Sequence, residues 1–337
     1  NLFYPVLKWL GFFHSLAKIR ITPGLKGWLA DFNPEIVYLQ VSTRDTILFA
    51  MELKEYLKVP SVIHIMDDWP STVSKRGILN KYWDRIIDRE FRKLLDGTDL
   101  FLSISEAMSS EYRKRYAKDF IAFHNPIDIQ FWTQKSKTDH MVNKEHVKVL
   151  FSGRIGIGVA ESLLDLGLVV ESLNNAALNV KLYIQSPSND KKILDRLRKL
   201  KSVVINPVAE YSELPAIFSN ADILAITNDF DRESIDYLKY SMPTKASEYM
   251  ISGTPILVYS HSETAVSRFF TANKCGYCIS ERNSDKLRDG LMLLIENEQY
   301  RQDISANAVM IAKELFDANT VRLKFQDLLR TTSLIKK

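Results

Sequence analysis

Cysteine is nearly absent from the sequence, with only Cys275 and Cys278 among 337 residues. Two cysteines cannot form a disulfide framework, and this scarcity fits a cytosolic protein. Their CxxC spacing also occurs in redox pairs and in halves of metal sites, but here no second pair and no nearby histidine accompany it. We therefore expect both cysteines to have a structural role.

Long hydrophobic runs are missing as well. Lys8 and His14 interrupt the best candidate, so no segment is predicted to span a bilayer, and no signal-peptide cleavage pattern follows. Acidic residues are absent from residues 1–30, which contain four basic and six aromatic residues. Such a segment is typical either of ordinary packing helices or of an amphipathic stretch on an anionic membrane surface.

The net charge of +4 is too small to indicate a nucleic-acid partner, and the content of 46% hydrophobic and 26% charged residues is that of a globular protein. The length favours about two domains. Short apolar runs alternate with helical patterns throughout, at residues 36–39, 61–65, 100–104, 120–123, 147–151, 180–184, 203–205, 222–226 and 255–259. Nearly continuous apolar strands that alternate with helices predict parallel sheets covered on both faces.

The strand and helix rhythm appears twice, and a polar stretch at residues 133–146 separates the two halves. We therefore predict an α/β fold of two Rossmann-like domains that face each other across a cleft. The expected boundaries are residues 1–140 and 141–315, with a C-terminal helix in 316–337 that packs back on the first domain. Ligands in such sheets bind at the carboxyl ends of the strands.

A glycine-rich turn, SGRIGIG, follows the predicted strand at 147–151. Gly153 and Gly156 let backbone N–H groups approach a phosphate, and Arg154 adds a fixed charge with a geometry suited to phosphate oxygens. The glycine spacing is GxxGxG, which differs from the GxGxxG of dinucleotide-binding proteins. The turn therefore indicates a phosphate site or a tight strand-to-helix connection, and it is a poor match for NAD.

The stretch SMPTKASEYMISGTPILVY, residues 241–259, predicts a short helix with Ser241 as its cap and Pro243 in its first turn. Lys245 and Glu248 share one face of this helix, and they could form an ordinary surface ion pair. A lysine at the positive end of a helix is unfavourable, which instead suggests an anionic ligand. On that interpretation Lys245 binds a phosphate and Glu248 accepts hydrogen bonds from a ribose diol.

The same stretch resembles the donor-site segment of GT-B glycosyltransferases, in particular retaining enzymes of the family 4 type, also called glycosyl transferases group 1. Other segments that resemble the family follow in the expected order, namely LFLSISEAMSSEY, FHNPIDIQFW, FSGRIG and NKCGYCI. The resemblance covers roughly residues 34–330 and is more specific in the second half.

The resemblance implies transfer of a sugar from a nucleotide diphosphate sugar to a hydroxyl acceptor, with retention at the anomeric carbon. Arg154 and Lys245 would bind the donor diphosphate, the backbone of Gly153 and Gly156 would line the phosphates, and Glu248 would bind the ribose. Family members of this kind usually need no metal or other cofactor. Preplaced cations stabilise the charge that develops on a departing diphosphate.

Two departures from the family pattern concern the sugar. Many members have a second glutamate at the position of Tyr240, so the possible sugar contacts are Tyr240 and the nearby acids, among them Asp229 and Asp231. In the first half, VIHIMDDWP resembles the segment that usually offers a His-Asp pair to the sugar. The candidate catalytic residues there are His64, Asp67 and Asp68, although His64 is equally typical of a core histidine.

A third departure is that nothing before Ile36 resembles the family's opening strand and glycine-rich loop. We expect either a truncated sequence or a reduced first domain.

Three alternative functions stay open. Asp229 and Asp231 form a DxD motif of the kind that binds a metal in GT-A transferases. The chain could also be a nicotinamide dehydrogenase, or a non-catalytic subunit that binds a sugar nucleotide or a lipid surface.

The resemblance also implies partners and a location. The expected partners are a nucleotide sugar donor and a glycan or lipid-linked acceptor, with no nucleic acid and with an anionic membrane surface contacted through residues 1–30. The expected setting is the synthesis of cell-surface polysaccharide or glycolipid. The protein would be cytoplasmic and peripheral on the inner face of the membrane.

Overall fold

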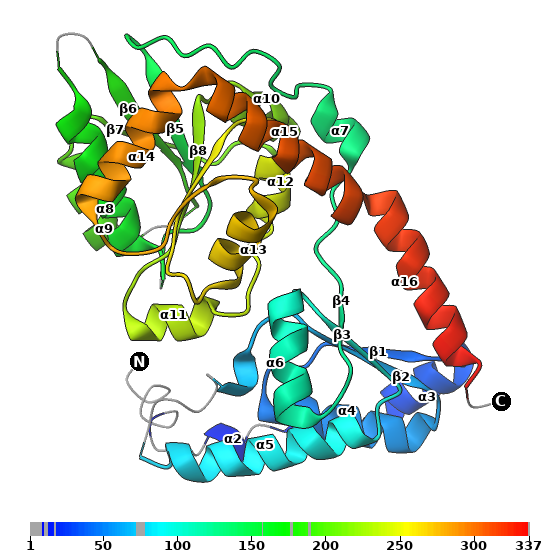
Figure 1. The fold of residues 1–337 in the computed structure, drawn as a ribbon. Helices are drawn as coiled ribbons and strands as arrows, with labels where there is room; N and C mark the ends of the chain where they lie inside the picture. The colour runs from blue at the N-terminus through cyan, green and yellow to red at the C-terminus, as the bar shows by residue number, and fades with distance from the viewer. Residues whose placement is uncertain are drawn as a thin grey trace. The chain divides into compact units, whose positions relative to one another are not determined.

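The structure is a computed structural model, and it describes residue 9 and residues 13–16, 18–71, 78–156, 158–175, 178–187 and 190–335. The chain forms two compact units (Figure 1). The first comprises residues 1–124 together with 322–337, and the second comprises residues 125–321. Each unit contains one parallel β-sheet flanked by helices, as the apolar runs predict.

The first unit is built on a four-stranded parallel sheet in the order β1-β2-β3-β4. Its strands are β1 (Val37–Leu39), β2 (Ser61–Ile65), β3 (Leu100–Ser103) and β4 (Ile121–Ala122). Its helices are α2 (Phe13–Leu16), α3 (Pro23–Phe32), α4 (Arg44–Leu57), η1 (Trp69–Ser71), α5 (Asn80–Asp96) and α6 (Glu106–Tyr116). Strand β2 is buried along its whole length, because strands lie on both sides of it.

Helix α16 (Ala318–Ser333) returns the end of the chain to the first unit. The ring of Phe325 lies 5.6 Å from the ring of Tyr38 on β1 and 5.7 Å from that of Phe123, measured between centroids. These contacts attach the helix, through the partly buried Phe325, to residues far away in the sequence.

The second unit is built on a six-stranded parallel sheet in the order β10-β9-β8-β5-β6-β7. Its strands are β5 (Val147–Ser152), β6 (Val180–Gln185), β7 (Val203–Asn206), β8 (Ile223–Thr227), β9 (Ile256–Tyr259) and β10 (Tyr277–Ile279). The chain order reverses between β5 and β8. Ligands bind at the carboxyl ends of strands beside such a switch point.

Helices cover both faces of this second sheet (Figure 1). They are α7 (Ile129–Thr133), α8 (Ala160–Leu173), α9 (Lys191–Arg198), η2 (Tyr211–Glu213), α10 (Leu214–Ser219), α11 (Arg232–Leu238), α12 (Lys245–Ile251), α13 (Ala265–Asn273), α14 (Ser284–Glu296) and α15 (Glu298–Leu315). Helices α8, α9 and α14 enclose one hydrophobic core, and α10, α12, α13 and α15 enclose the other.

The polar stretch at residues 133–146 belongs to the second unit, which begins at residue 125 instead of residue 141. The buried ring of Trp132 stacks on Phe218, with centroids 5.5 Å apart. The Lys137 N–H donates to the Ser252 carbonyl at 2.7 Å, and the Lys137 ammonium donates to the carbonyls of Ser219 and Ala221. These contacts, which composition alone does not indicate, attach the stretch to the second sheet's helices.

Among the residues that the structure describes, no helix has the length and apolar character needed to cross a membrane. Most of residues 1–12, which the expected membrane contact includes, lie outside the described part of the chain.

Candidate donor site

The glycine turn after β5 lies directly against Lys245. Gly153 has a φ of +146°, a conformation that favours glycine, and its N–H donates to the Gln185 carbonyl at 2.9 Å. A Cβ added at Gly153 would lie 3.3 Å from Lys245 Nζ. At Gly156 an added Cβ would meet no described atom within 4 Å, so the space beside that backbone is open. The turn therefore brings backbone groups and a lysine together next to free space.

Tyr249 fixes helix α12 to the end of β5. Its fully buried ring carries a hydroxyl that accepts a hydrogen bond from the Ser152 N–H at 2.8 Å. Lys245 is one turn earlier on the same helix, so this hydrogen bond sets the distance between Lys245 and the turn. The position of the lysine thus depends on a tyrosine whose hydroxyl bonds to the strand end and whose ring packs on Phe218, with centroids 4.9 Å apart.

Lys245 has no anionic partner within the described structure. Its Nζ lies 3.9 Å from the centroid of the Phe151 ring, a cation–π contact. Burial lowers the pKa of Lys245 to about 7. No carboxylate or carbonyl of a described residue accepts a hydrogen bond from this ammonium, which is unusual for a cation removed from water. An anionic ligand at the turn would supply the missing partner.

Glu248 is also without a partner among the described residues. Burial raises the pKa of its carboxyl to about 7. No ion pair joins it to Lys245, so the surface ion pair that the spacing allowed is not formed. A half-buried carboxylate of this kind is able to accept hydrogen bonds from ligand hydroxyl groups.

Helix α12 begins later than predicted. It starts at Lys245 after Thr244, whose side chain makes no capping hydrogen bond. Pro243 precedes the helix, and its carbonyl accepts a hydrogen bond from the Ala246 N–H at 3.0 Å. The expected cap at Ser241 and first turn at Pro243 are therefore wrong, because residues 241–243 form an irregular approach.

Arg154 directly follows Gly153, and its side chain is exposed to solvent. No ion pair of Arg154 occurs within the described part of the chain. The turn therefore presents one exposed cation and one half-buried cation at the carboxyl end of β5, beside the switch point of the sheet.

The acids after β8 serve as helix caps. Asp229 is buried, and its carboxylate accepts a hydrogen bond from the Ser162 N–H in the first turn of α8 at 2.7 Å. Burial raises the pKa of Asp229, and the hydrogen bonds from Ser162 oppose this. Asp231 caps α11, accepting from the N–H of Ser234 at 3.0 Å and from its hydroxyl at 2.5 Å. Hydrogen bonding to Ser234 lowers the pKa of Asp231.

These caps account for both carboxylates of the DxD motif without a metal. The described residues contain no group of three or more His, Cys, Asp or Glu side chains arranged to hold a metal ion. Tyr240, at the position where the family often has glutamate, is buried, and Lys239 Nζ lies 5.7 Å from its ring centroid.

In the first unit, Asp68 is the centre of a hydrogen-bond network. Its buried carboxylate accepts two hydrogen bonds from Arg115, at 2.9 and 2.8 Å, one from the Tyr112 hydroxyl at 2.9 Å and one from the Ser71 hydroxyl at 2.8 Å. Both oxygens are fully engaged, so Asp68 links η1 to α6. Asp67, in contrast, is exposed.

His64 packs inside the first unit. Its Nδ1 is hydrogen-bonded to the Tyr38 hydroxyl at 2.7 Å, and burial lowers its pKa to about 4. The imidazole is therefore neutral at neutral pH. The sequence leaves open whether His64 is a catalytic residue or a core histidine, and this environment favours the core histidine.

Both cysteines are free, and Cys275 lies in a hydrophobic core. Burial raises the pKa of Cys275 to about 12 and also raises that of Cys278. The thiols are protonated at neutral pH, which fits the structural role expected for them.

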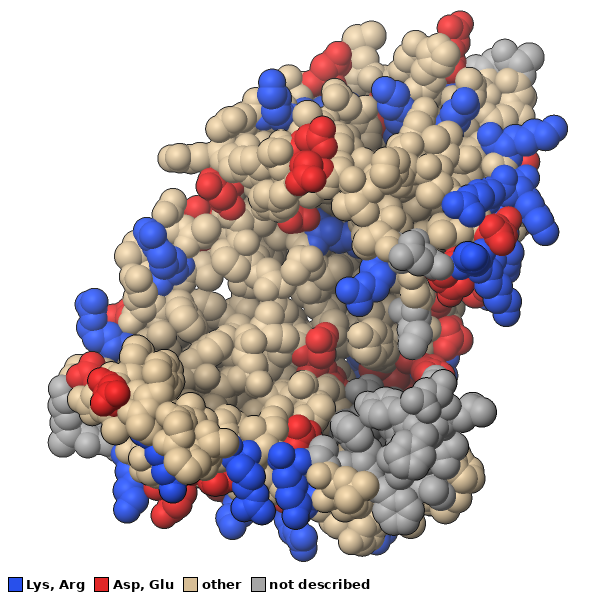
Figure 2. Space-filling model, turned by 180° about the vertical axis from the view of Figure 1, so that it is seen from behind, with Lys and Arg blue, Asp and Glu red and all other residues tan. Residues whose placement is uncertain are grey.

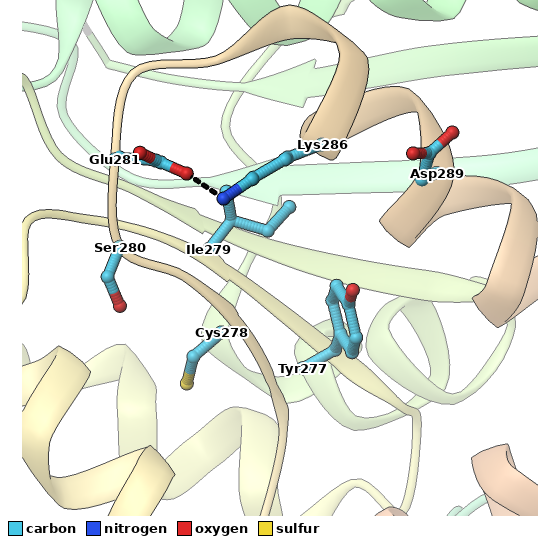
Figure 3. A pocket seen from close by; sticks show the side chains of 7 residues that line it. All are labelled: Tyr277, Cys278, Ile279, Ser280, Glu281, Lys286 and Asp289. Carbon is cyan, nitrogen blue, oxygen red and sulfur yellow. Dashed lines mark ion pairs between the residues drawn. The ribbon is translucent and has the colours of Figure 1, made fainter.

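Cys278 lines a hollow of about 580 Å³ beside β10 (Figure 3). Glu281 and Lys286 form an ion pair at its rim, and the hydrogen bond that the Lys286 ammonium donates to Glu281 raises the pKa of Lys286. None of the predicted site residues lines this hollow. Because its lysine is already neutralised, it is less suited to a diphosphate than the turn at Gly153.

The sequence profile of the family Glycosyl transferases group 1 matches residues 133–309, just over half of the 337 residues. The chain belongs to this family, and it is a glycosyltransferase. A search of curated protein sequences found no match.

Solved structures with the same fold include three glycosyltransferases of low sequence identity. Sucrose-phosphate synthase from Thermosynechococcus elongatus has a TM-score of 0.68 and 11% identity, over 91% of this chain and 75% of that one. HepE of Anabaena, in complex with UDP-glucose, has a TM-score of 0.67 and 15% identity, over 92% and 83%. The α,α-trehalose 6-phosphate synthase of Burkholderia multivorans has a TM-score of 0.67 and 14% identity, over 99% and 82%.

These findings confirm the predicted GT-B fold and the predicted enzyme class. The GT-A and dehydrogenase alternatives are wrong. The chain has two parallel sheets of the GT-B type, and the acids of the DxD motif cap helices.

Two residues of the site escaped the sequence analysis, namely Phe151 and Tyr249. Phe151 lies two positions before Gly153 and therefore on the same side of the strand, which could have drawn attention to it. No sequence signal singles out Tyr249, because an aromatic residue in a helix next to a core strand is ordinary.

Proposed function

We propose that this glycosyltransferase moves a sugar from a nucleotide diphosphate sugar to a hydroxyl acceptor, with retention at the anomeric carbon. The bond between the anomeric carbon and the diphosphate oxygen breaks, and the acceptor oxygen forms the new bond as it loses its proton. The observation that carries this proposal is Lys245, a half-buried cation beside a glycine turn without a protein partner. The UDP-glucose in the HepE structure supports it.

The leaving diphosphate gains negative charge as the bond breaks, and we propose that Lys245 and Arg154 stabilise it. The backbone of Gly153 and Gly156 leaves room for the phosphate oxygens. Glu248, one turn further along α12, accepts hydrogen bonds from the ribose. Two cations perform the role that a metal has in other transferases, so we propose that no metal is required.

We propose that the sugar contacts the second unit near Tyr240. Asp68 is assigned a structural role, because its oxygens already accept four hydrogen bonds. Asp229 and Asp231 are assigned to capping for the same reason.

The acceptor is proposed to be a glycan or a lipid-linked glycan of cell-surface polysaccharide or glycolipid synthesis. The support is the resemblance to the family 4 type. Retention would be tested by NMR of the product, in which the anomeric configuration of the donor should be preserved.

The donor site is tested by thermal shift and calorimetry. Stabilisation by one of UDP-, GDP-, ADP- or dTDP-sugars identifies the nucleotide. Lys245→Ala should raise the donor Kd about tenfold or more, because a hydrogen bond to a charged group contributes about 1.5–3 kcal/mol. Unchanged affinity would contradict the site.

Glu248→Gln provides the matched comparison. It should weaken binding of the ribonucleotide and leave binding of pyrophosphate unchanged, because only the ribose contact is changed. Equal loss of both ligands would point to misfolding instead.

A further inference from the structure

Helix α5 of the first unit carries a ridge of four cations, Lys81, Arg85, Arg89 and Lys93. They are spaced four residues apart and therefore lie along one face of the helix. All four side chains are exposed. None of the four forms an ion pair with any residue that the structure describes. We call this set the α5 basic ridge.

The opposite face of α5 explains why the ridge points to solvent. Trp83, Ile87, Phe91 and Leu94 are buried in the core of the unit. Like charges four residues apart repel each other, so the ridge weakens the helix that carries it. The neighbouring Arg92 shows the alternative, because it pairs with Asp88 at 2.8 Å. Unlike Arg92, the ridge is available to an external anion.

Apolar side chains continue the ridge at the N-terminal end of the helix. Ile78, Leu79 and Tyr82 are 62%, 41% and 55% exposed. Trp9 is 54% exposed, and its carbonyl accepts a hydrogen bond from the Ile78 N–H at 3.1 Å, which places it beside this group. We call these four residues the α5 apolar end. An exposed aromatic and apolar group next to unpaired cations is typical of a surface that rests in a lipid interface.

We infer that α5 attaches the first unit to an anionic membrane surface. The basic ridge contacts the lipid headgroups, and the apolar end inserts among the upper parts of the acyl chains. Figure 2 shows Lys and Arg side chains, with some Asp and Glu among them, along the lower margin of this view. The exposed apolar end favours lipid over nucleic acid, which would use the cations alone. The inference does not depend on the donor site and extends the expected membrane contact beyond residues 1–30.

The test is co-sedimentation of the full chain with vesicles of phosphatidylcholine, with and without about 30% phosphatidylglycerol. The chain should bind the anionic vesicles, and binding should weaken as salt is raised. Arg85→Ala with Arg89→Ala should reduce the binding constant about thirtyfold, because two cations near the surface are lost. Tyr82→Ser should reduce binding even at high salt, where the contribution of the ridge is screened.

Lys199→Ala with Lys201→Ala is the matched control, because it removes the same charge from exposed positions in the second unit. It should bind vesicles as the unchanged chain does. Circular dichroism and donor affinity should be the same in all variants. The inference is overturned by equal loss in the control, by no binding to anionic vesicles, or by equal binding to neutral ones. It is also overturned if an oligonucleotide binds the ridge and vesicles do not.

Discussion

The carboxyl ends of β2 and β5 hold charged side chains in opposite situations. Asp68, after β2, accepts four hydrogen bonds from three neighbouring side chains. Lys245, beside the end of β5, has a phenylalanine ring against its ammonium and no hydrogen-bond acceptor within the described chain. Both residues carried functional expectations from sequence motifs. The comparison shows that motif position alone does not separate a structural charge from one that is available to a ligand.

The physical distinction is where the partner of the charge lies. A buried charge with all its partners inside the protein contributes to the fold, and its loss costs stability. A buried charge without partners costs stability itself, and a protein retains it when a ligand supplies the missing interaction. Substitutions at the two places should therefore have opposite effects.

The largest effect is expected at Asp68. Asp68→Asn should lower the free energy of unfolding by about 2–3 kcal/mol, because Arg115 loses one of its two carboxylate partners in a partly buried place. Urea denaturation measures this, and the exposed neighbour provides a control, since Asp67→Asn should change stability by less than about 0.5 kcal/mol. Loss of turnover at unchanged stability would instead make Asp68 a catalytic residue.

Lys245→Met should have the opposite effect and raise the free energy of unfolding. The pKa of Lys245 is about 7 in the folded chain and 10.5 in its ordinary state, so between these values the unfolded chain binds more protons. The contribution of Lys245 to the free energy of unfolding of the unchanged protein therefore rises with pH between these two values. The variant should be more stable below pH 7, and its advantage should shrink toward pH 10. Urea denaturation from pH 6 to 9.5 tests this, and parallel pH curves would refute it.

Asp229→Ala should lower stability by about 1 kcal/mol, the usual effect of losing a helix cap. Donor affinity of the variant and of the unchanged protein should be the same with EDTA and with added magnesium. A metal-dependent donor affinity that disappears in the variant would restore a metal role for the carboxylate.

The smallest effect is expected from Phe151→Leu. Loss of the ring removes a cation–π contact of about 0.5–1 kcal/mol, so the donor Kd should rise about threefold. Leu150→Met is the control, because Leu150 belongs to the core on the other face of the same sheet. It should leave the donor Kd unchanged. Calorimetry with the nucleotide measures both, and an equal response would mean that the ring does not position Lys245.

Most of the fold could be predicted from the sequence, because parallel strands buried on both faces are nearly continuous apolar runs. Each predicted run contains a strand, and the pattern at residues 147–151 becomes β5 with only a short extension. The polar stretch at 133–146 was less predictable. Its attachment depends on backbone hydrogen bonds such as that of Lys137 to Ser252, which composition does not reveal.

The sequence was enough to predict which residues form the candidate site, but not which contacts their side chains make. The motif places Lys245, Glu248 and the glycine turn at one sheet edge. It does not show that Lys245 rests on Phe151, because that contact depends on how Tyr249 holds the helix. Asp67 and Asp68 are chemically identical neighbours, and only the positions of Arg115 and Tyr112 make one of them structural.

The return of α16 to the first unit has a consequence for synthesis on the ribosome. The second unit is continuous in sequence, whereas the first takes residues 322–337 from beyond it. Domains generally fold as their chain emerges. The first unit must therefore wait, with Tyr38 and Phe123 lacking Phe325, until the whole of the second unit has been translated. The later half of the polypeptide can complete its fold before the earlier half does.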